Sequence, residues 1–288
     1  LMTGASLVLT GVMAVLTVLA VQGRREAERQ RAQADGLIEY MLTDLREKLE
    51  PVGRLEVMDS VGQRALAYYA AQDLSGLDPD ALGRRARALH LVGEVRDLRG
   101  DSEGALTAFR EAERTTAELL ARDPENPDRM FDHAQSVFWV GQTAWARKDW
   151  PTAESKFRRY AELAEAMAAT DPANPKWIAE QAYAANSLGA LLLRQGNPRA
   201  AVPQFERYVA KADRLAELEP ANLDRLFEQG QARAWLADAL LGTGRLKAAT
   251  EARQRELGFY AGILASDPQH ATARSSLAVA QNALAELE

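Results

Sequence analysis

The amino-acid sequence predicts an all-α protein built from repeated pairs of helices. An acidic residue followed by proline returns every 48 residues, at Asp123-Pro124, Asp171-Pro172, Glu219-Pro220 and Asp267-Pro268. Columns of small and aromatic residues keep the same spacing, and no segment shows the sustained two-residue alternation of a β-strand. A fixed period of this length is typical of a solenoid, in which each unit buries its apolar face against its neighbours.

The chain begins with an uncharged segment over residues 1–23 that is rich in Leu, Val, Ala and Met. At 1.5 Å per residue, about 22 residues reach roughly 33 Å, which is enough to cross the hydrocarbon core of a bilayer. The segment lacks the basic start of a signal peptide and the polar stripe of an interfacial helix. We therefore expect a transmembrane helix. The opening Leu-Met also indicates that further residues precede Leu1.

Residues 24–48 form a charged helical stretch that is expected to lead from the span into a capping pair. This stretch is either a solvated stalk or a signalling helix that carries motion across the bilayer. Residues 49–76 follow as a degenerate N-terminal capping helix, with a turn at Pro51-Val52-Gly53. The apolar side of this segment is expected at Leu55, Val57, Met58, Val61, Leu66 and Tyr69.

Four repeats follow, over residues 77–124, 125–172, 173–220 and 221–268. Each begins near a proline, which fits the first turn of a helix because its missing N–H donor is not needed there. Within each repeat, two segments with apolar residues every three or four positions are separated by a glycine or a short polar stretch. This is typical of the end of a helix, where a residue in the left-handed conformation stops the helix. Residues 269–288 have room for one more helix, either a C-terminal cap or a truncated fifth repeat.

Small and aromatic residues predict where the two helices of a repeat touch. The first helices carry glycine and the second helices phenylalanine at matching positions: Gly93, Gly141 and Gly189, and Phe109, Phe157 and Phe205. Glycine inside a helix costs about 1 kcal/mol relative to alanine, so its return indicates a steric need. We expect the glycine to admit a close approach and the phenylalanine to fill the adjoining space. The fourth repeat departs from this pattern with Ala237 and Arg253.

These positions resemble the tetratricopeptide repeat family. In that family a glycine in the first helix is followed by a turn glycine, an early alanine and an aromatic residue in the second helix, and a proline between repeats. That order is followed by Gly93, Gly100, Ala105, Phe109 and Pro124, and by Gly189, Gly196, Ala201, Phe205 and Pro220. The resemblance implies a right-handed α–α superhelix. The 48-residue unit exceeds the roughly 34 residues of the family, which predicts longer helices. The large aromatic expected early in the first helix is replaced by Leu89, Val137, Ala185 and Arg233.

The resemblance also implies that the first helices line a concave face that binds a protein or peptide. Candidate partner-binding residues are the first-helix positions that packing does not require: Arg87, His90, Glu94, Asp97, Gln135, Phe138, Gln142, Trp145, Tyr183, Asn186, Gln231 and Asp238. Rigid aromatic side chains supply contact area, and amides supply hydrogen bonds to a peptide backbone. For Phe138 and Trp145 the alternative is a core role in the longer helices.

With its span and capping segment, the chain is similar to the C-terminal sensor regions of bacterial membrane signalling proteins. In those proteins a kinase, Toll-receptor-like or winged-helix domain precedes the span. The resemblance implies a membrane-anchored interaction or sensor module in a bacterial inner membrane. The alternatives are the regulatory region of an upstream enzyme or transcription regulator, and a scaffold that self-associates through its C-terminal helix. Arginines after the span favour cytoplasmic repeats, whereas the resemblance favours periplasmic ones.

Composition points away from catalysis and from nucleic acid. The net charge of −6 argues against a nucleic-acid partner, since phosphate binding needs a concentrated basic face. The chain has no cysteine, and its three histidines show no metal-binding spacing. We therefore expect no catalytic residue, metal or cofactor in this segment. The basic run Arg84-Arg85-Ala86-Arg87 is expected to be solvated helix surface, and residues 242–247 a turn between helices rather than a phosphate-binding loop.

Overall fold

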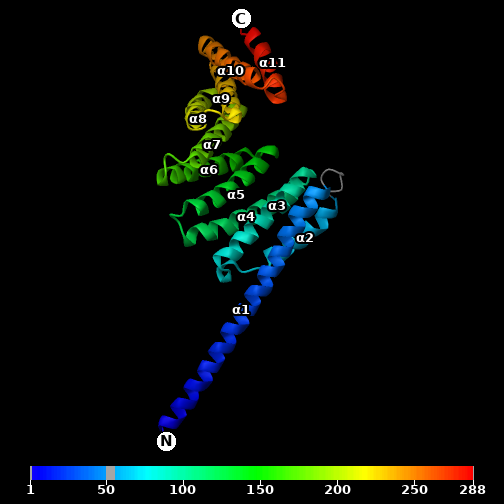
Figure 1. Ribbon diagram of the computed structural model, residues 1–288, viewed down its shortest axis with the longest axis vertical. Helices are drawn as coiled ribbons and strands as arrows, with labels where there is room; N and C mark the ends of the chain where they lie inside the picture. The colour runs from blue at the N-terminus through cyan, green and yellow to red at the C-terminus, as the bar shows by residue number, and fades with distance from the viewer. Residues whose placement is uncertain (1, 50–55, 288) are drawn as a thin grey trace. The chain divides into compact units, whose positions relative to one another are not determined.

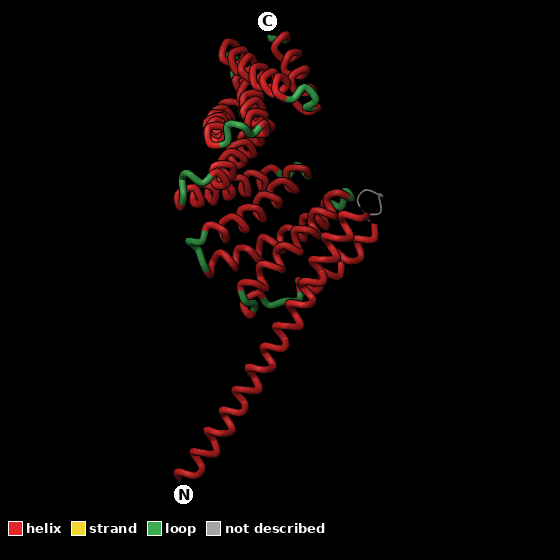
Figure 2. Tube along the Cα trace, viewed as in Figure 1, coloured by secondary structure: helices red, strands yellow, loops and turns green. Residues whose placement is uncertain are grey.

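The computed structural model describes the backbone of residues 2–49 and 56–287, and the side chains of residues 13–38, 40–41 and 60–287. Over this part of the chain, the secondary structure consists of α-helices and one short 3-10 helix, without a strand (Figure 1, Figure 2). The all-α prediction is confirmed. The chain divides into two compact units, unit 1 over residues 1–122 and unit 2 over residues 123–288.

The described residues of unit 1 form four helices and a short 3-10 turn. These are α1 (Met2–Leu49), α2 (Glu56–Ala70), the 3-10 turn (Leu74–Gly76), α3 (Pro79–Leu98) and α4 (Ser102–Arg122). The expected span and stalk form one continuous helix, α1. Among the residues that the structure describes, no helix is both long enough and apolar enough to cross a membrane. The predicted span over residues 1–23 is therefore not confirmed, and the side chains of residues 1–12 lie outside the described part.

The core of unit 1 contains the apolar side of α2. Val61, Leu66 and Tyr69 pack with residues of α3, among them Leu89 and Val92. Tyr69 is fully buried, so the capping segment contributes to the core as its pattern predicted. The expected turn at residues 51–53 and the side chains at positions 55, 57 and 58 lie outside the described residues.

The basic run in α3 was expected to be solvated surface, and this holds for Arg87, which is exposed, but is wrong for Arg85. Arg85 is 0% exposed, and its Nη2 donates to the backbone oxygen of Tyr69 and to Oε2 of Glu111, both at 2.8 Å. The Arg84 guanidinium forms an ion pair at 3.5 Å with the buried Asp35 of α1, and burial raises the pKa of that carboxyl. A guanidinium can be buried in this way because its donors pair with carboxylates and backbone oxygens of other helices.

Residues 123–287 of unit 2 form seven helices, and each helix packs against the next along the chain. They are α5 (Pro127–Ala146), α6 (Trp150–Thr170), α7 (Pro175–Arg194), α8 (Pro198–Leu218), α9 (Leu223–Gly242), α10 (Leu246–Ser266) and α11 (Ala271–Ala285). In Figure 1 they run from green to red, in chain order. The first helices are α5, α7 and α9, and the second helices are α6, α8 and α10.

Caps and prolines set the helix boundaries in unit 2. Asn126 caps α5 and Asn174 caps α7, each accepting a hydrogen bond of 3.0 Å from a backbone N–H of the first turn. Proline follows each cap at the first helical position. The second helix α6 ends at Thr170, immediately before an acidic-proline pair. That pair therefore marks the end of a second helix, as the sequence predicted.

The turns between paired helices contain a residue in the left-handed region of backbone space. Gly100, Gly196 and Gly244 have φ values of 79°, 75° and 77°, and Lys148 takes the same role at 61°. In the last of these turns, the backbone N–H of Arg245 donates to the oxygen of Leu240 at 3.0 Å, as in a helix C-cap. The predicted turn is present but shorter than residues 242–247: it spans residues 243–245, and Leu246 and Lys247 already belong to α10, the helix Leu246–Ser266.

The predicted contact between glycine and phenylalanine is present in three repeats. A Cβ atom added at Gly141 or Gly189 would lie 2.8 Å from the ring of Phe157 or Phe205, and one added at Gly93 would be closer still to Phe109. The three rings are 0% exposed. Only a residue without a side chain fits against these rings, so the packing account is confirmed.

Candidate functional site

Three of the candidate residues stand 48 residues apart, one on each first helix of unit 2. They are Gln135 on α5, Tyr183 on α7 and Gln231 on α9. We call the side of these helices that carries the three residues the first-helix face. Tyr183 is 42% exposed and Gln231 is also exposed. Gln135 is half-buried because its amide donates to Oε2 of Glu180 at 3.0 Å. The exposed Tyr183 ring and the exposed Gln231 amide are therefore accessible on this face.

The other candidates of unit 2 differ in accessibility. Gln142 is exposed, whereas Asn186 is half-buried and its Oδ1, shielded from solvent, accepts no hydrogen bond from the described residues. Phe138 and Trp145 pack against the hydrophobic core, with their ring centroids 6.2 and 6.1 Å from that of Phe157. These two side chains have a packing role, which was the alternative weighed for them.

Asp238 of α9 belongs to an ion-pair network, although nearly half of its side chain is exposed. Its carboxylate pairs with Nη2 of Arg253, and Nη1 of the same guanidinium donates to Glu256 at 2.7 Å. Burial raises the pKa of the carboxyls of Asp238 and Glu256, although the arginine opposes that shift. Because the Arg253 guanidinium already neutralises it, Asp238 offers less charge to a ligand than its sequence position indicates.

The four candidates of unit 1 lie on α3. Arg87 and Asp97 are exposed, and Glu94 and His90 are half-buried. The ring of His90 lies 5.9 Å from that of Phe109, and burial lowers the pKa of His90 to about 4. His90 is therefore neutral at pH 7 and cannot supply a positive charge there.

A column of acidic residues on the first helices was not singled out from the sequence. Asp132, Glu180 and Glu228 stand 48 residues apart, on α5, α7 and α9. Glu180 is 6% exposed, and Oε2 of its carboxyl accepts hydrogen bonds from the hydroxyl of Tyr160 at 2.6 Å and from Gln135. Burial raises the pKa of Glu180, and these two donors oppose the shift. Stepping by 48 from Asp132 would have revealed the column.

Two further polar contacts join each repeat of unit 2 to the next. Gln181 of α7 donates to Oε2 of Glu165 on α6 at 2.6 Å, and Gln229 of α9 donates to Oδ1 of Asp213 on α8 at 2.7 Å. The second pair lies 48 residues after the first. Arg233 strengthens the second contact, since its Nη2 lies 2.9 Å from both oxygens of Asp213. These contacts fix how one repeat is seated on the next.

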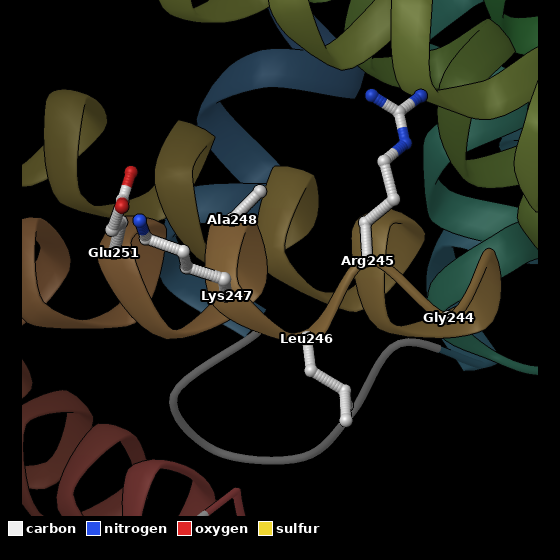
Figure 3. Close-up of a pocket in the computed structure, with 6 residues that line it drawn as sticks. All are labelled: Gly244, Arg245, Leu246, Lys247, Ala248 and Glu251. Carbon is white, nitrogen blue, oxygen red and sulfur yellow. The ribbon is translucent and has the colours of Figure 1, made fainter.

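A hollow lies at the turn between α9 and α10 and is lined by Gly244, Arg245, Leu246, Lys247, Ala248 and Glu251. The side chains of Arg245, Leu246 and Lys247 diverge from one another (Figure 3). Arg245 occupies the N-cap of α10 without a capping hydrogen bond from its side chain. Because the two basic groups point apart, the hollow does not gather positive charge as a phosphate site does.

The acidic and histidine side chains of the described residues are dispersed or paired. They contain no group of three His, Asp or Glu residues placed to hold a metal ion. The buried carboxylates of unit 2, Glu180, Glu228 and Glu256, each accept from tyrosine, glutamine or arginine donors. Aromatic rings and amides instead provide hydrogen bonds and contact area for an extended partner.

Comparison with solved structures identifies the architecture. A kinesin light chain-like protein of nearly identical TPR-like repeats from Podosopora anserina superimposes with a TM-score of 0.55 at 16% identity, over 78% of this chain and 97% of the other. BtubC (BKLC) from P. vanneervenii gives a TM-score of 0.53 at 13% identity, over 81% and 92% of the two chains. The fold is that of a tetratricopeptide-like repeat protein. No family model and no curated protein sequence matches the chain.

Proposed function

We propose that this chain is a protein–protein interaction module whose first-helix face binds an extended segment of a partner protein or a peptide. The fold provides the basis, because stacked helix pairs expose a long row of first helices. The observation that carries the proposal is the column Gln135, Tyr183 and Gln231, in which an aromatic ring that is 42% exposed lies in register with amides on the neighbouring helices.

The chemistry of this column suits a peptide backbone. Tyrosine offers a large rigid surface and a polar tip at low cost in side-chain entropy, and glutamine can both donate to and accept from a peptide group. The shared 48-residue register gives the three positions equivalent places on successive first helices. A strand-like segment laid across α5, α7 and α9 would meet one such residue on each helix.

The test is selection of peptides from a random twelve-residue library on the immobilised chain, followed by affinity measurement with purified peptide. A triple variant with Gln142→Ala, Tyr183→Ala and Gln231→Ala removes three exposed side chains of the first helices. We expect it to weaken binding at least tenfold, which corresponds to about 1.4 kcal/mol.

A second triple variant provides the matched control. Ser155→Ala, Glu206→Ala and Gln254→Ala remove three exposed side chains of the second helices. This control should bind the selected peptides as the unaltered chain does. Unchanged affinity in the first triple variant, or an equal loss in both, would contradict the proposed use of the first-helix face.

Attachment to a bacterial inner membrane is a separate proposal, and the support for it is the uncharged sequence of residues 1–23. The side of the membrane on which the repeats lie is open. Extraction of cell membranes with alkaline carbonate tests the attachment, because a spanning chain stays in the pellet. Release of the chain into the supernatant would refute it.

A further inference from the structure

One position of the acidic column lacks the arginine partner that its two neighbours have. In the second and fourth repeats, an arginine three residues before the acidic residue pairs with it: Arg129 with Asp132 at 3.5 Å, and Arg225 with Glu228 at 3.1 Å. In the third repeat the arginine position holds Trp177 instead. No guanidinium of the described residues pairs with Glu180.

Two aromatic rings and a cation occupy the place of the missing arginine. The ring centroids of Phe131 on α5 and Trp177 on α7 lie 6.0 Å apart. The Nζ atom of Lys176 lies 3.6 Å from the centroid of Phe131 and 4.7 Å from that of Trp177. An ammonium over aromatic faces at such distances is held by cation–π attraction. Its positive charge also acts on Glu180, one turn further along α7.

The rings and the carboxylate are fixed by packing, whereas the cation is on a flexible side chain. Trp177 is 5% exposed and Glu180 is 6% exposed. Oε2 of Glu180 is held by Tyr160 and Gln135, and its Oε1 accepts no hydrogen bond from the described part of the chain. Lys176 is exposed and stands at the second position of α7. The four-carbon stem of a lysine can swing away at little cost.

We propose that Phe131, Trp177 and Glu180 form a cation site that binds a lysine or arginine side chain of a partner peptide. Lys176 occupies the cation site when no partner is bound and leaves when the ligand cation enters. The inference rests on the proposed function for the partner being a peptide, and it adds that this peptide carries a basic residue. The acidic net charge of the chain, −6, favours a basic partner over long range.

Competition by Lys176 has a measurable consequence. A side chain tethered beside its site acts at an effective concentration of roughly millimolar, so a free cation must displace it. Lys176→Ala removes the competitor and leaves both rings and the carboxylate. We expect this variant to bind a free cation about tenfold more tightly than the unaltered chain.

The probes are Nα-acetyl-lysine amide and Nα-acetyl-arginine amide, titrated into the full chain. The indole N–H resonance of Trp177, assigned by its loss in Trp177→Phe, reports binding. In Lys176→Ala the resonance should shift saturably, with a Kd about tenfold below that of the unaltered chain. Lys247→Ala is the control, because it removes an exposed lysine that is also the second residue of its helix, α10. That control should titrate as the unaltered chain does.

Two variants made on the Lys176→Ala background test the composition of the site. Glu180→Gln keeps an acceptor for Tyr160 while removing the charge, and Phe131→Leu keeps apolar volume while removing an aromatic face. Each should raise the Kd for the lysine amide about tenfold, with circular dichroism unchanged. The uncharged Nα-acetyl-norleucine amide should not shift the resonance. A shift that does not saturate, or one that norleucine amide reproduces, would overturn the cation site.

The selected peptides separate this inference from the proposed function. If norleucine replaces every basic residue of a selected peptide without loss of affinity, the peptide does not use the cation site and the inference fails while the proposed function stands. If the lysine amide binds as expected but no peptide is selected, the cation site stands and the proposed function fails.

Discussion

The third and fourth repeats of the chain reach the same pairing of helices by different chemistry. In the third repeat, α7 and α8, Gly189 lies against the ring of Phe205, and the ring is 0% exposed. In the fourth repeat, α9 and α10, the equivalent residues are Ala237 and Arg253, and the arginine is only 8% exposed. An apolar ring and a buried guanidinium thus occupy the same register position.

The fourth repeat compensates for this exchange about two helical turns away, on both of its helices. The tyrosine of the third repeat, Tyr208, is replaced by Glu256, and a new tyrosine appears four residues later at Tyr260. A Cβ atom added at Gly230 would lie 2.6 Å from the Tyr260 ring, so the glycine that admits an aromatic ring has moved as well. In both repeats a glycine faces an aromatic ring. The position of this contact within the repeat differs between them.

The difference shows that the 48-residue register determines which helices pair. It does not determine whether a ring contact or an ion pair stabilises that pairing. Dispersion and burial stabilise the ring contact at any pH. The network of Arg253, Asp238 and Glu256 depends on the charge of carboxyls whose pKa is raised by burial. The two repeats should therefore respond differently to substitution and to acid.

The largest effect is expected at the contact between glycine and phenylalanine. Gly189→Leu should lower the free energy of unfolding by more than about 3 kcal/mol, because even a single added carbon would lie 2.8 Å from the Phe205 ring. Gly258→Leu is the matched control, since a side chain there meets open space within α10. Urea unfolding measures both variants. Helix propensity favours leucine over glycine at both positions, so a loss in Gly258→Leu as large as that in Gly189→Leu would show that the ring contact does not account for the cost.

Removal of the guanidinium should have the next largest effect, and one that depends on pH. Arg253→Ala leaves the buried carboxyl of Glu256 without its partner and should cost about 3 kcal/mol at pH 7. Burial holds the folded-state pKa of Glu256 above its unfolded value. The folded state therefore binds the proton more tightly, so stability rises as pH falls through the folded-state pKa toward the unfolded value of about 4.3.

The penalty of Arg253→Ala should accordingly shrink between pH 7 and pH 5. Urea midpoints at several pH values, compared with those of the unaltered chain, measure this. Phe205→Leu in the third repeat is the comparison variant, and its penalty should be independent of pH over the same range. A constant penalty for Arg253→Ala would mean that lost packing, and not the unpaired carboxyl, accounts for the cost.

A smaller difference is expected between two tyrosine hydroxyls. Tyr160 donates to Glu180 at 2.6 Å, whereas Tyr208 lies 3.4 Å from Oε1 of Gln231. Tyr160→Phe should cost about 1–2 kcal/mol because it removes a short hydrogen bond to a buried carboxyl. Tyr208→Phe should cost under about 0.5 kcal/mol, because its hydrogen bond is long. Thermal unfolding of the two variants, measured in parallel, compares their losses of stability. A larger loss in Tyr208→Phe than in Tyr160→Phe would contradict the roles given to these hydroxyls.

The smallest difference is expected at the turns, where the two repeats are alike. Gly196 and Gly244 have φ values of 75° and 77°. Gly196→Ala and Gly244→Ala should each cost about 1 kcal/mol, because a side chain disfavours the left-handed region. The two losses should agree within experimental error. A clear inequality would show that the turns, and not only the packing, differ between the repeats.

Much of the fold could be predicted because its causes are local or periodic. The turn glycines, the prolines at first helical positions and the glycine–phenylalanine columns each follow from a steric rule that acts on a few residues. Of the candidate site, the exposure of Tyr183 and Gln231 agrees with their assignment as unpacked positions. Phe138 and Trp145 could not be assigned from sequence, because the pattern along one helix does not show whether a side chain packs against a ring of another helix.

Charged residues were the least predictable from sequence. The sequence pattern predicts an exposed Arg85, yet the side chain is fully buried. Its guanidinium donates hydrogen bonds to Glu111 and to the backbone of Tyr69. In the sequence, Glu180 does not differ from the other acidic residues of the amphipathic helices. In the structure, its carboxylate accepts hydrogen bonds from Tyr160 and Gln135, which belong to two other helices. Burial of a charge depends on partners brought from elsewhere in the chain.

The sequence by itself determined the period, the helix pairs, their turns and the contact between small residue and ring, because these follow from sterics within one repeat unit. Only the tertiary structure decided which charges are buried, which repeat replaces a ring with an ion pair, and where a lysine lies over two aromatic rings. Hydrogen bonds and ion pairs need donor and acceptor at defined distances, and those distances exist only once separate helices have packed together.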